Sequence, residues 1–167
     1  AYTNNGIVRT TDYRYLVDFN KIFPDSKDKE CVWAFTKFYS AGKSSFGWDI
    51  NCFGPMVVYV NGEVAYKSDI FKERYSETST RVFMDVEEGW NDIRIQFKKT
   101  KAGFGGQFGT WIGKWDMYTL MPTKERDGQE GFVFTELVPD DYVPEFEIGM
   151  SEKDFDKKLY PVINWSD

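Results

Sequence analysis

The segment Met56-Val-Val-Tyr-Val-Asn-Gly-Glu-Val-Ala-Tyr-Lys67 decides the fold class. Asn61 and Gly62 lie between two runs of β-branched and aromatic residues, and this pair is the preferred chemistry of a two-residue type I′ turn. Both turn residues need a positive φ, which Asn and Gly tolerate. The segment therefore predicts a tight antiparallel β-hairpin.

The rest of the chain predicts further short strands. Thr80–Val86 and Asp92–Lys98 flank a turn at Glu87–Asn91, and apolar and polar residues alternate with a period of two in the second of these strands. Additional strands are expected over 12–19, 31–39, 44–52 and 107–120, and short helical segments over 70–75 and 152–159. Sequential strands closed by short turns favour sheet pairing over a βαβ arrangement. We therefore predict an all-β fold, an antiparallel β-sandwich.

The composition limits the classes of function. The chain has 167 residues, a formal charge of −6, 15 Phe, 10 Tyr and 6 Trp, and no His. This length suits one domain with a real core. The lack of His excludes Ser-His-Asp and Cys-His nucleophiles and His-ligated metals. The acidic balance argues against a nucleic-acid partner. No apolar run approaches the roughly 18 to 20 residues that span a bilayer, so we expect no membrane insertion.

The amino-acid composition of the sequence changes after Leu120. Residues 1–120 carry the predicted sandwich, whereas 121–167 are polar and broken by prolines. We expect the latter region to be a connector or an extended tail that packs on the sandwich, with one added strand over 131–137. The chain begins at Ala1 without an initiator Met or a signal peptide, so we expect it to be part of a longer polypeptide.

The two cysteines lie on the strands on either side of Ser40–Lys43, which we expect to form a hairpin. In that register Cys31 lies opposite Cys52. A cross-strand disulfide can then form, although two buried thiols fit the sequence equally well. The face that holds both cysteines also holds Trp33 and Trp48 and is apolar, so we assign it to the core.

The opposite face of the same hairpin is polar. It carries Asp49 and Asn51 among small residues. Carboxylate and amide groups accept and donate hydrogen bonds to sugar hydroxyls, so we expect these two residues to contact a carbohydrate. An ordinary solvated sheet face is the alternative.

A segment rich in Gly and Trp follows the glycine-rich loop at 101–106. If Phe108 faces the core, Trp111 and Trp115 point to the opposite side, flanked by glycines. The C–H face of a pyranose is weakly positive and complements the negative face of an indole. We therefore expect these two indoles to bind a sugar ring. Packing of the indoles against the tail or a neighbouring domain is the alternative.

Three residues near these indoles complete the expected site. Gln107 and Lys114 carry polar groups that would orient the sugar. Phe104 lies within the glycine-rich loop, where we expect it to contact the ligand at the loop tip.

Catalytic and metal-binding signals are weak. No motif fixes two carboxylates at the separation that a glycosidase needs, so we expect no catalytic residues and no enzyme activity. Asp25, Asp28 and the pair Asp140–Asp141 offer oxygen donors for a structural calcium ion. They lack EF-hand spacing, so we expect no required cofactor.

Three segments together resemble a known family. Val57–Val64, Glu88–Ile95 and Gly105–Ile112 are similar in order and character to galactose-binding-like β-sandwich domains. These are the jelly-roll sugar-binding or accessory modules attached to bacterial glycoside hydrolases and polysaccharide lyases. The resemblance spans residues 30–120 and concerns the fold more than the ligand, because this fold hosts many functions.

The resemblance implies a jelly roll and a non-catalytic carbohydrate-binding module of a secreted or surface-displayed bacterial polysaccharide-degrading protein. The expected partners are a polysaccharide or oligosaccharide and the catalytic domain of a larger parent polypeptide. The alternative is a structural accessory domain that packs against a catalytic domain and binds no glycan of its own.

Overall fold

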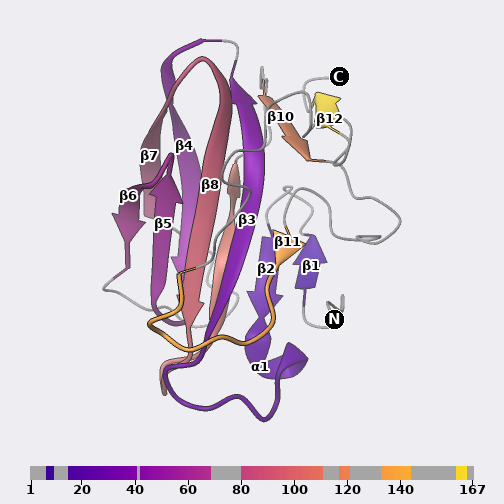
Figure 1. Ribbon diagram of the computed structural model, residues 1–167, viewed down its shortest axis with the longest axis vertical. Coiled ribbons are helices and arrows are strands. Elements are labelled where there is room, and N and C mark those ends of the chain that lie inside the picture. The colour runs from indigo at the N-terminus through magenta and orange to yellow at the C-terminus, as the bar shows by residue number, and fades with distance from the viewer. Residues whose placement is uncertain are drawn as a thin grey trace.

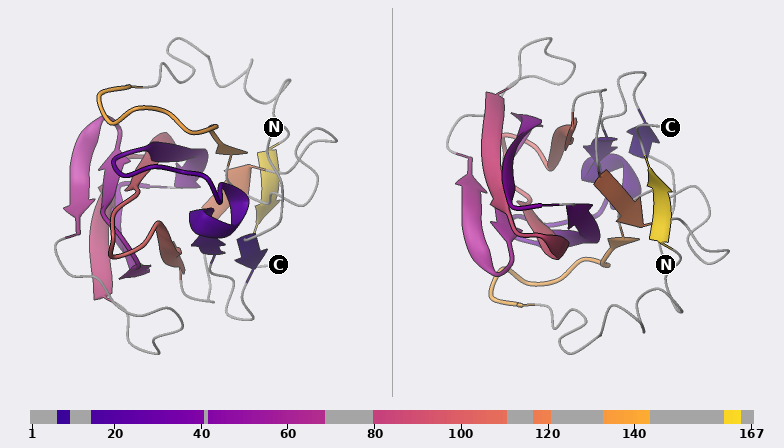
Figure 2. Two further views of the ribbon diagram at one scale, coloured as in Figure 1. Left: turned by 90° about the horizontal axis from the view of Figure 1, so that it is seen from below. Right: turned by 90° about the horizontal axis from the view of Figure 1, so that it is seen from above.

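The computed structural model describes residues 7–9, 15–40, 42–68, 80–110, 117–120, 133–143 and 161–164. Their strands form two sheets, and all strand pairs are antiparallel (Figure 1). Figure 2 shows the same strands from the two ends of the long axis. The prediction of an all-β antiparallel sandwich is confirmed.

One sheet has five strands and the other has seven. The five-stranded sheet has the spatial order β1 (Ile7–Arg9), β2 (Tyr15–Asp18), β9 (Gly105–Thr110), β4 (Ser44–Cys52) and β7 (Thr80–Val86). The seven-stranded sheet has the order β12 (Pro161–Asn164), β10 (Met117–Leu120), β3 (Cys31–Ser40), β8 (Gly89–Lys98), β5 (Met56–Val60) and β6 (Glu63–Lys67), with β11 (Val133–Phe134) also paired to β3. Because neighbours along the chain often lie in opposite sheets, most connections cross the sandwich.

The predicted hairpin around Asn61 and Gly62 is confirmed. Strands β5 and β6 pair with Val60 opposite Glu63, so the turn has two residues. The φ angles of Asn61 and Gly62 are 51° and 84°. These positive values are the ones that the Asn-Gly pair was expected to supply.

The strand expected over residues 12–19 is shorter at its end than predicted. Strand β2 stops at Asp18, and the short helix α1 (Phe19–Ile22) follows at once. The Asp18 carboxylate accepts a hydrogen bond from the backbone N–H of Asn20 at 3.2 Å, which caps the helix. The helical segments expected over 70–75 and 152–159 lie outside the described residues.

The hairpin expected between residues 31 and 52 is wrong. Strand β3 pairs with β8 along its length, with Cys31 opposite Lys98, whereas β4 belongs to the other sheet. The short connection between the two strands therefore passes from one sheet to the other. Cys31 and Cys52 are both buried and free, so there is no disulfide between them. A short loop is compatible with both arrangements, and loop length alone does not choose between them.

This change of sheet alters the side-chain pattern of β3. Val32 and Ala34 belong to the core cluster, so Trp33 lies on the outer face of its sheet. There the indole is only 4% exposed and stacks on Tyr59, with 5.7 Å between ring centroids. The assignment of Trp33 to the sandwich interior is wrong, although it is buried. Trp48 lies in the core as predicted.

The expected strand over 107–120 is also wrong, because β9 and β10 are separate strands in different sheets. Within the C-terminal region, β11 and β12 add to the seven-stranded sheet. Phe134 of β11 enters the core and meets Phe19 edge-on, with 5.8 Å between ring centroids. Val138 pairs with Cys31 by two backbone hydrogen bonds of 2.8 and 2.9 Å.

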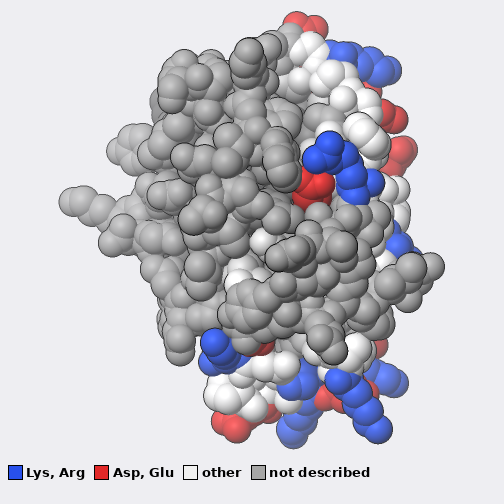
Figure 3. Space-filling model, turned by 180° about the vertical axis from the view of Figure 1, so that it is seen from behind, with Lys and Arg blue, Asp and Glu red and all other residues white. Residues whose placement is uncertain are grey.

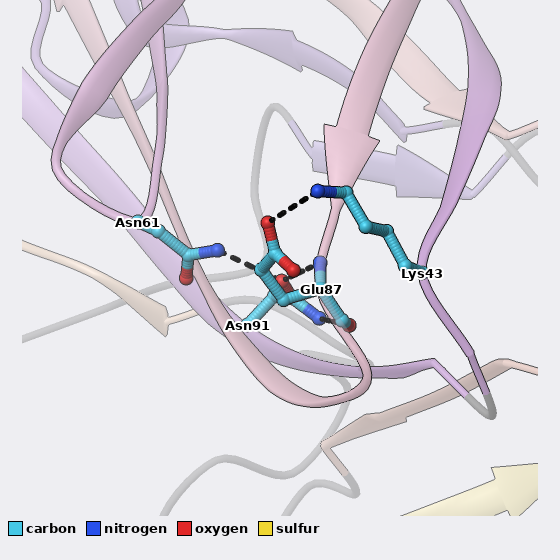
Figure 4. Close-up of polar contacts among 4 residues, drawn as sticks. All are labelled: Lys43, Asn61, Glu87 and Asn91. Carbon is cyan, nitrogen blue, oxygen red and sulfur yellow. Dashed lines mark hydrogen bonds and ion pairs between the residues drawn. The ribbon is translucent and has the colours of Figure 1, made fainter.

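A network of polar side chains joins three connections at one end of the sandwich (Figure 4). Asn91, which is fully buried, donates to the backbone carbonyls of Glu87 and Gly89 and accepts from the backbone N–H of Glu87. It also accepts a hydrogen bond from Asn61 in the β5–β6 turn. Lys43, beside the start of β4, forms an ion pair with Glu87 at 3.7 Å. Asn91 thus fixes the turn that precedes the long stretch of β8.

Candidate functional site

Three predicted site residues lie together on the outer face of the five-stranded sheet. Ile50 and Phe108 point into the core, so Asp49, Asn51 and Gln107 point away from it. Asn51 and Gln107 lie directly opposite each other on the neighbouring strands β4 and β9. Asp49, Asn51 and Gln107 are 5%, 1% and 9% exposed. The structure thus gathers a carboxylate and two amides on one face, and we call this set the polar row.

Asp49 forms an ion pair with Arg81, which lies opposite it on β7. The guanidinium donates from Nε to Oδ1 at 3.1 Å and from Nη2 to Oδ2 at 3.3 Å. The Asp49 side chain is 7% exposed and the Arg81 side chain is 51% exposed. This bidentate hydrogen bonding raises the pKa of Arg81 above its usual range. The cation is therefore held over the buried carboxylate.

Phe83 lies beside this ion pair and is 68% exposed. It sits opposite Gly47 in the ladder between β4 and β7. A Cβ built on Gly47 would lie 3.1 Å from the Arg81 side chain and 3.5 Å from the Phe83 ring. Gly47 therefore leaves the space into which both side chains fold, and the polar row ends in a cation and an exposed aromatic ring.

Sequence reasoning missed Arg81 and Phe83, although the signal was present. In β7, Met84 and Val86 alternate with charged residues and face the core. That alternation places Arg81, Phe83 and Asp85 on the outer face. An aromatic residue in phase with two charged residues is the pattern that marks an exposed ring.

The predicted loop-tip residue Phe104 lies in the core instead. It is 1% exposed, and its ring centroid is 5.2 Å from that of Phe19. The backbone N–H of Phe19 also donates to the Phe104 carbonyl at 2.9 Å. Gly103 and Gly105, with φ of 146° and 135°, turn the chain so that the ring between them points inward.

The glycines of this loop serve close backbone packing. A Cβ on Gly103 would lie 2.5 Å from the Phe53 carbonyl oxygen, and one on Gly105 would lie 2.2 Å from the Val17 carbonyl oxygen. A Cβ on Gly106 would lie 2.8 Å from the Asn51 carbonyl oxygen. The glycine richness is thus explained by contacts within the fold.

Trp111, Lys114 and Trp115 lie outside the described residues. They follow Thr110, the last residue of β9. Their assignment to one face assumed a single strand over 107–120, and that strand is not formed. Their role in ligand binding therefore stays a prediction.

Three of the described basic residues near the sheet ends have acidic or polar partners. Arg94 pairs with Asp92 at 2.8 Å, and Lys98 lies 4.0 Å from Asp140. Lys99 donates a hydrogen bond to Asn20. Figure 3 shows acidic side chains beside the basic ones on the face that it presents. The two ion pairs, Arg94–Asp92 and Lys98–Asp140, offer little net positive charge to an anionic polymer.

Metal binding has little support in the described part of the chain. Among the residues that the structure describes, no group of three or more His, Cys, Asp and Glu could hold a metal ion. Asp25 and Asp28 line a shallow hollow together with Lys27. Asp140 faces Lys98. In the same described residues, no helix is long and apolar enough to cross a membrane.

Comparisons with known proteins assign no family. No protein-family model matches the sequence. None of the curated proteins compared with it matches either.

Proposed function

We propose that the chain is a non-catalytic carbohydrate-binding module that recognises a polysaccharide through aromatic stacking and polar contacts. The observation that carries this proposal is the outer face of the five-stranded sheet. There Arg81, which is half-exposed and is held by Asp49 of the polar row, lies two positions before the exposed Phe83 on the same strand. Sugar-binding surfaces need this combination of a flat apolar ring and fixed hydrogen-bonding groups.

The strand order supports the proposal at the level of the fold family. If β2 to β9 are counted as eight strands, the sheets contain the orders 1-8-3-6 and 2-7-4-5. Two nested Greek keys give this order, which is typical of a jelly roll. We propose on this basis that the domain is a galactose-binding-like sandwich. A place in a secreted or cell-surface bacterial protein, next to a catalytic domain, is part of the same proposal.

A structural accessory domain is the second candidate. The exposed ring of Phe83 favours it, because an apolar surface can also be covered by a neighbouring domain. In that case the polar row would serve packing against a partner, and the isolated chain would retain no glycan.

Affinity electrophoresis and calorimetry against a panel of neutral and acidic polysaccharides test the proposal. We expect at least one polysaccharide to be retained. Phe83→Ala, Trp111→Ala and Trp115→Ala variants are expected to weaken binding about tenfold or more where the ring stacks on sugar. Val64→Ala is the matched control, since Val64 is 58% exposed on edge strand β6 of the other sheet.

Three outcomes would contradict parts of the proposal. Retention of no glycan would reject carbohydrate binding and favour the accessory domain. Binding that all three aromatic variants leave unchanged would reject the site. Hydrolysis of a glycan by the purified chain would reject the non-catalytic role.

A further inference from the structure

We propose that the outer face of the five-stranded sheet selects neutral sugars and rejects uronic acids, with Asp49 and Arg81 as the residues that set this specificity. The inference rests on the proposed function and names the ligand class of the same site. A lone exposed arginine would favour the opposite class, because guanidinium groups bind carboxylates well. The selectivity follows from how Arg81 is held.

Arg81 is committed to Asp49. Two of its nitrogens, Nε and Nη2, already donate to the two carboxylate oxygens. A uronate that took over these two nitrogens would draw the cation away from Asp49. The Asp49 side chain is 7% exposed, so it would be left as a buried carboxylate without its counter-ion. Uncompensated buried charge is strongly unfavourable, and this cost opposes the exchange.

The charge around the pair also disfavours an anion. The negative charge of Asp49 and the positive charge of Arg81 cancel each other. Asp85 follows two positions after Phe83 on the same face of β7 and is exposed. The described end of this face is therefore neutral to acidic, and a polyanion would meet repulsion there.

A neutral pyranose meets a suitable surface at the same place. The Phe83 ring is 68% exposed and offers an apolar face to the C–H groups of a sugar. Beside this ring lies the Arg81 guanidinium, a polar group that is 51% exposed and is oriented by its two hydrogen bonds to Asp49. Gly47 keeps the ring and the ion pair close together. The site thus combines stacking with hydroxyl recognition and offers no unmatched cation.

The test compares one glycan in two charge states. The neutral polysaccharide that the full chain binds most tightly is oxidised at C6, which converts its hexose units to uronates. Calorimetry then gives the affinity for both forms. We expect the oxidised form to bind at least about tenfold more weakly. Equal or tighter binding of the oxidised form would overturn the inference while leaving carbohydrate binding intact. Retention of no polysaccharide at all would reject the proposed function itself.

Variants connect the selectivity to the named residues. Asp49→Asn removes the negative partner of Arg81. We therefore expect the ratio of the affinities for the neutral and the oxidised polysaccharide to fall about threefold or more. Asp92→Asn is the matched control, because Asp92 pairs with Arg94 at 2.8 Å on the other sheet; its preference is expected to equal that of the wild type. Asp85→Asn, at an exposed position, keeps the test available if Asp49→Asn does not fold, and it too should narrow the preference. An unchanged preference in the folded Asp85 and Asp49 variants would overturn the assignment.

Discussion

The side-chain amide of Asn61 donates a hydrogen bond of 2.8 Å to Oδ1 of Asn91 and thereby joins two turns (Figure 4). Asn61 belongs to the β5–β6 turn and Asn91 to the start of β8. Asn61 also accepts from the backbone N–H of Asp92 at 2.9 Å. Because β5 and β8 are neighbours in the sheet, this pair fixes their ends as well as the turn between β7 and β8. The residue that marks the turn in the sequence thus also sets a non-local contact.

Replacement of Asn91 by Ala tests how much this hydrogen-bond network contributes to the stability of the fold. Asn91 is 0% exposed, and the substitution leaves the polar groups of Glu87 and Gly89 without their partner. We expect the free energy of unfolding to fall by about 2–4 kcal/mol, measured by chemical denaturation. Asn20→Ala, at an exposed position, is the control and should change it by less than about 0.5 kcal/mol. Equal effects of the two substitutions would contradict a structural role for Asn91.

Local signals in the sequence were sufficient for part of the fold. The Asn61–Gly62 turn and the alternation of Ile93, Ile95 and Phe97 depend on neighbouring residues, and both predictions agree with the structure. The side of the sheet on which Trp33 lies depends instead on which strand pairs with β3. That partner is β8, whose first residue is 49 positions after the last residue of β3. No local pattern encodes this choice.

The same distinction between local signals and contacts with distant segments applies to the candidate site. Asp49 and Asn51 were placed on an outer face correctly, because alternation within β4 holds whichever strand lies beside it. For Phe83, alternation within β7 gives the outer face, whereas the space for the ring beside Arg81 depends on Gly47, its partner across the ladder. Phe104 was misplaced because a glycine-rich loop suggested exposure, whereas the glycines allow close backbone packing.

The backbone packs so closely around Gly105 that we expect one added methyl group to lower the stability of the fold strongly. A Cβ there would lie 2.2 Å from the carbonyl oxygen of Val17, and the φ of 135° is unfavourable for alanine. We expect Gly105→Ala to lower the free energy of unfolding by about 2–4 kcal/mol in thermal or chemical denaturation. Gly42→Ala is the control, since nothing lies within 4 Å of its Cβ position. A fully stable Gly105→Ala protein would refute this packing.

The burial of Phe134 in the core predicts that the C-terminal region stabilises the sandwich. Its ring is 8% exposed and packs in the core beside Phe19. We expect Phe134→Ala to cost about 3 kcal/mol, because it removes a buried ring and leaves a cavity. Denaturant unfolding of the full chain measures this cost. Val143→Ala, at a position that is 73% exposed, is the control and should cost less than about 0.5 kcal/mol. A loss as small as that of the control would mean that β11 contributes little to the core.

The buried thiol of Cys31 predicts a loss of stability in alkaline solution. Burial raises the pKa of Cys31 from 9.0 to about 11, and Asp140 adds to this effect while Lys98 and Gln96 oppose it. Between these two pH values the unfolded chain releases the proton that the folded chain keeps, so the free energy of unfolding falls as the pH rises. Below pH 9 the contribution of the Cys31 thiol to the free energy of unfolding is fully present.

The size of this effect is measured by comparing the wild type with Cys31→Ala across that pH window. We expect the wild type to lose about 2 kcal/mol more than the variant between pH 8 and pH 11, since a shift of one pKa unit corresponds to about 1.4 kcal/mol. Titrating groups that do not interact with Cys31 contribute equally to both proteins and cancel in the difference. Alkylation supplies a second readout: at pH 8 the folded wild type should react slowly with iodoacetamide, whereas the unfolded chain should react rapidly. Parallel stability profiles, together with rapid labelling of Cys31 in the folded protein, would show that the thiol is accessible and that its pKa is unshifted.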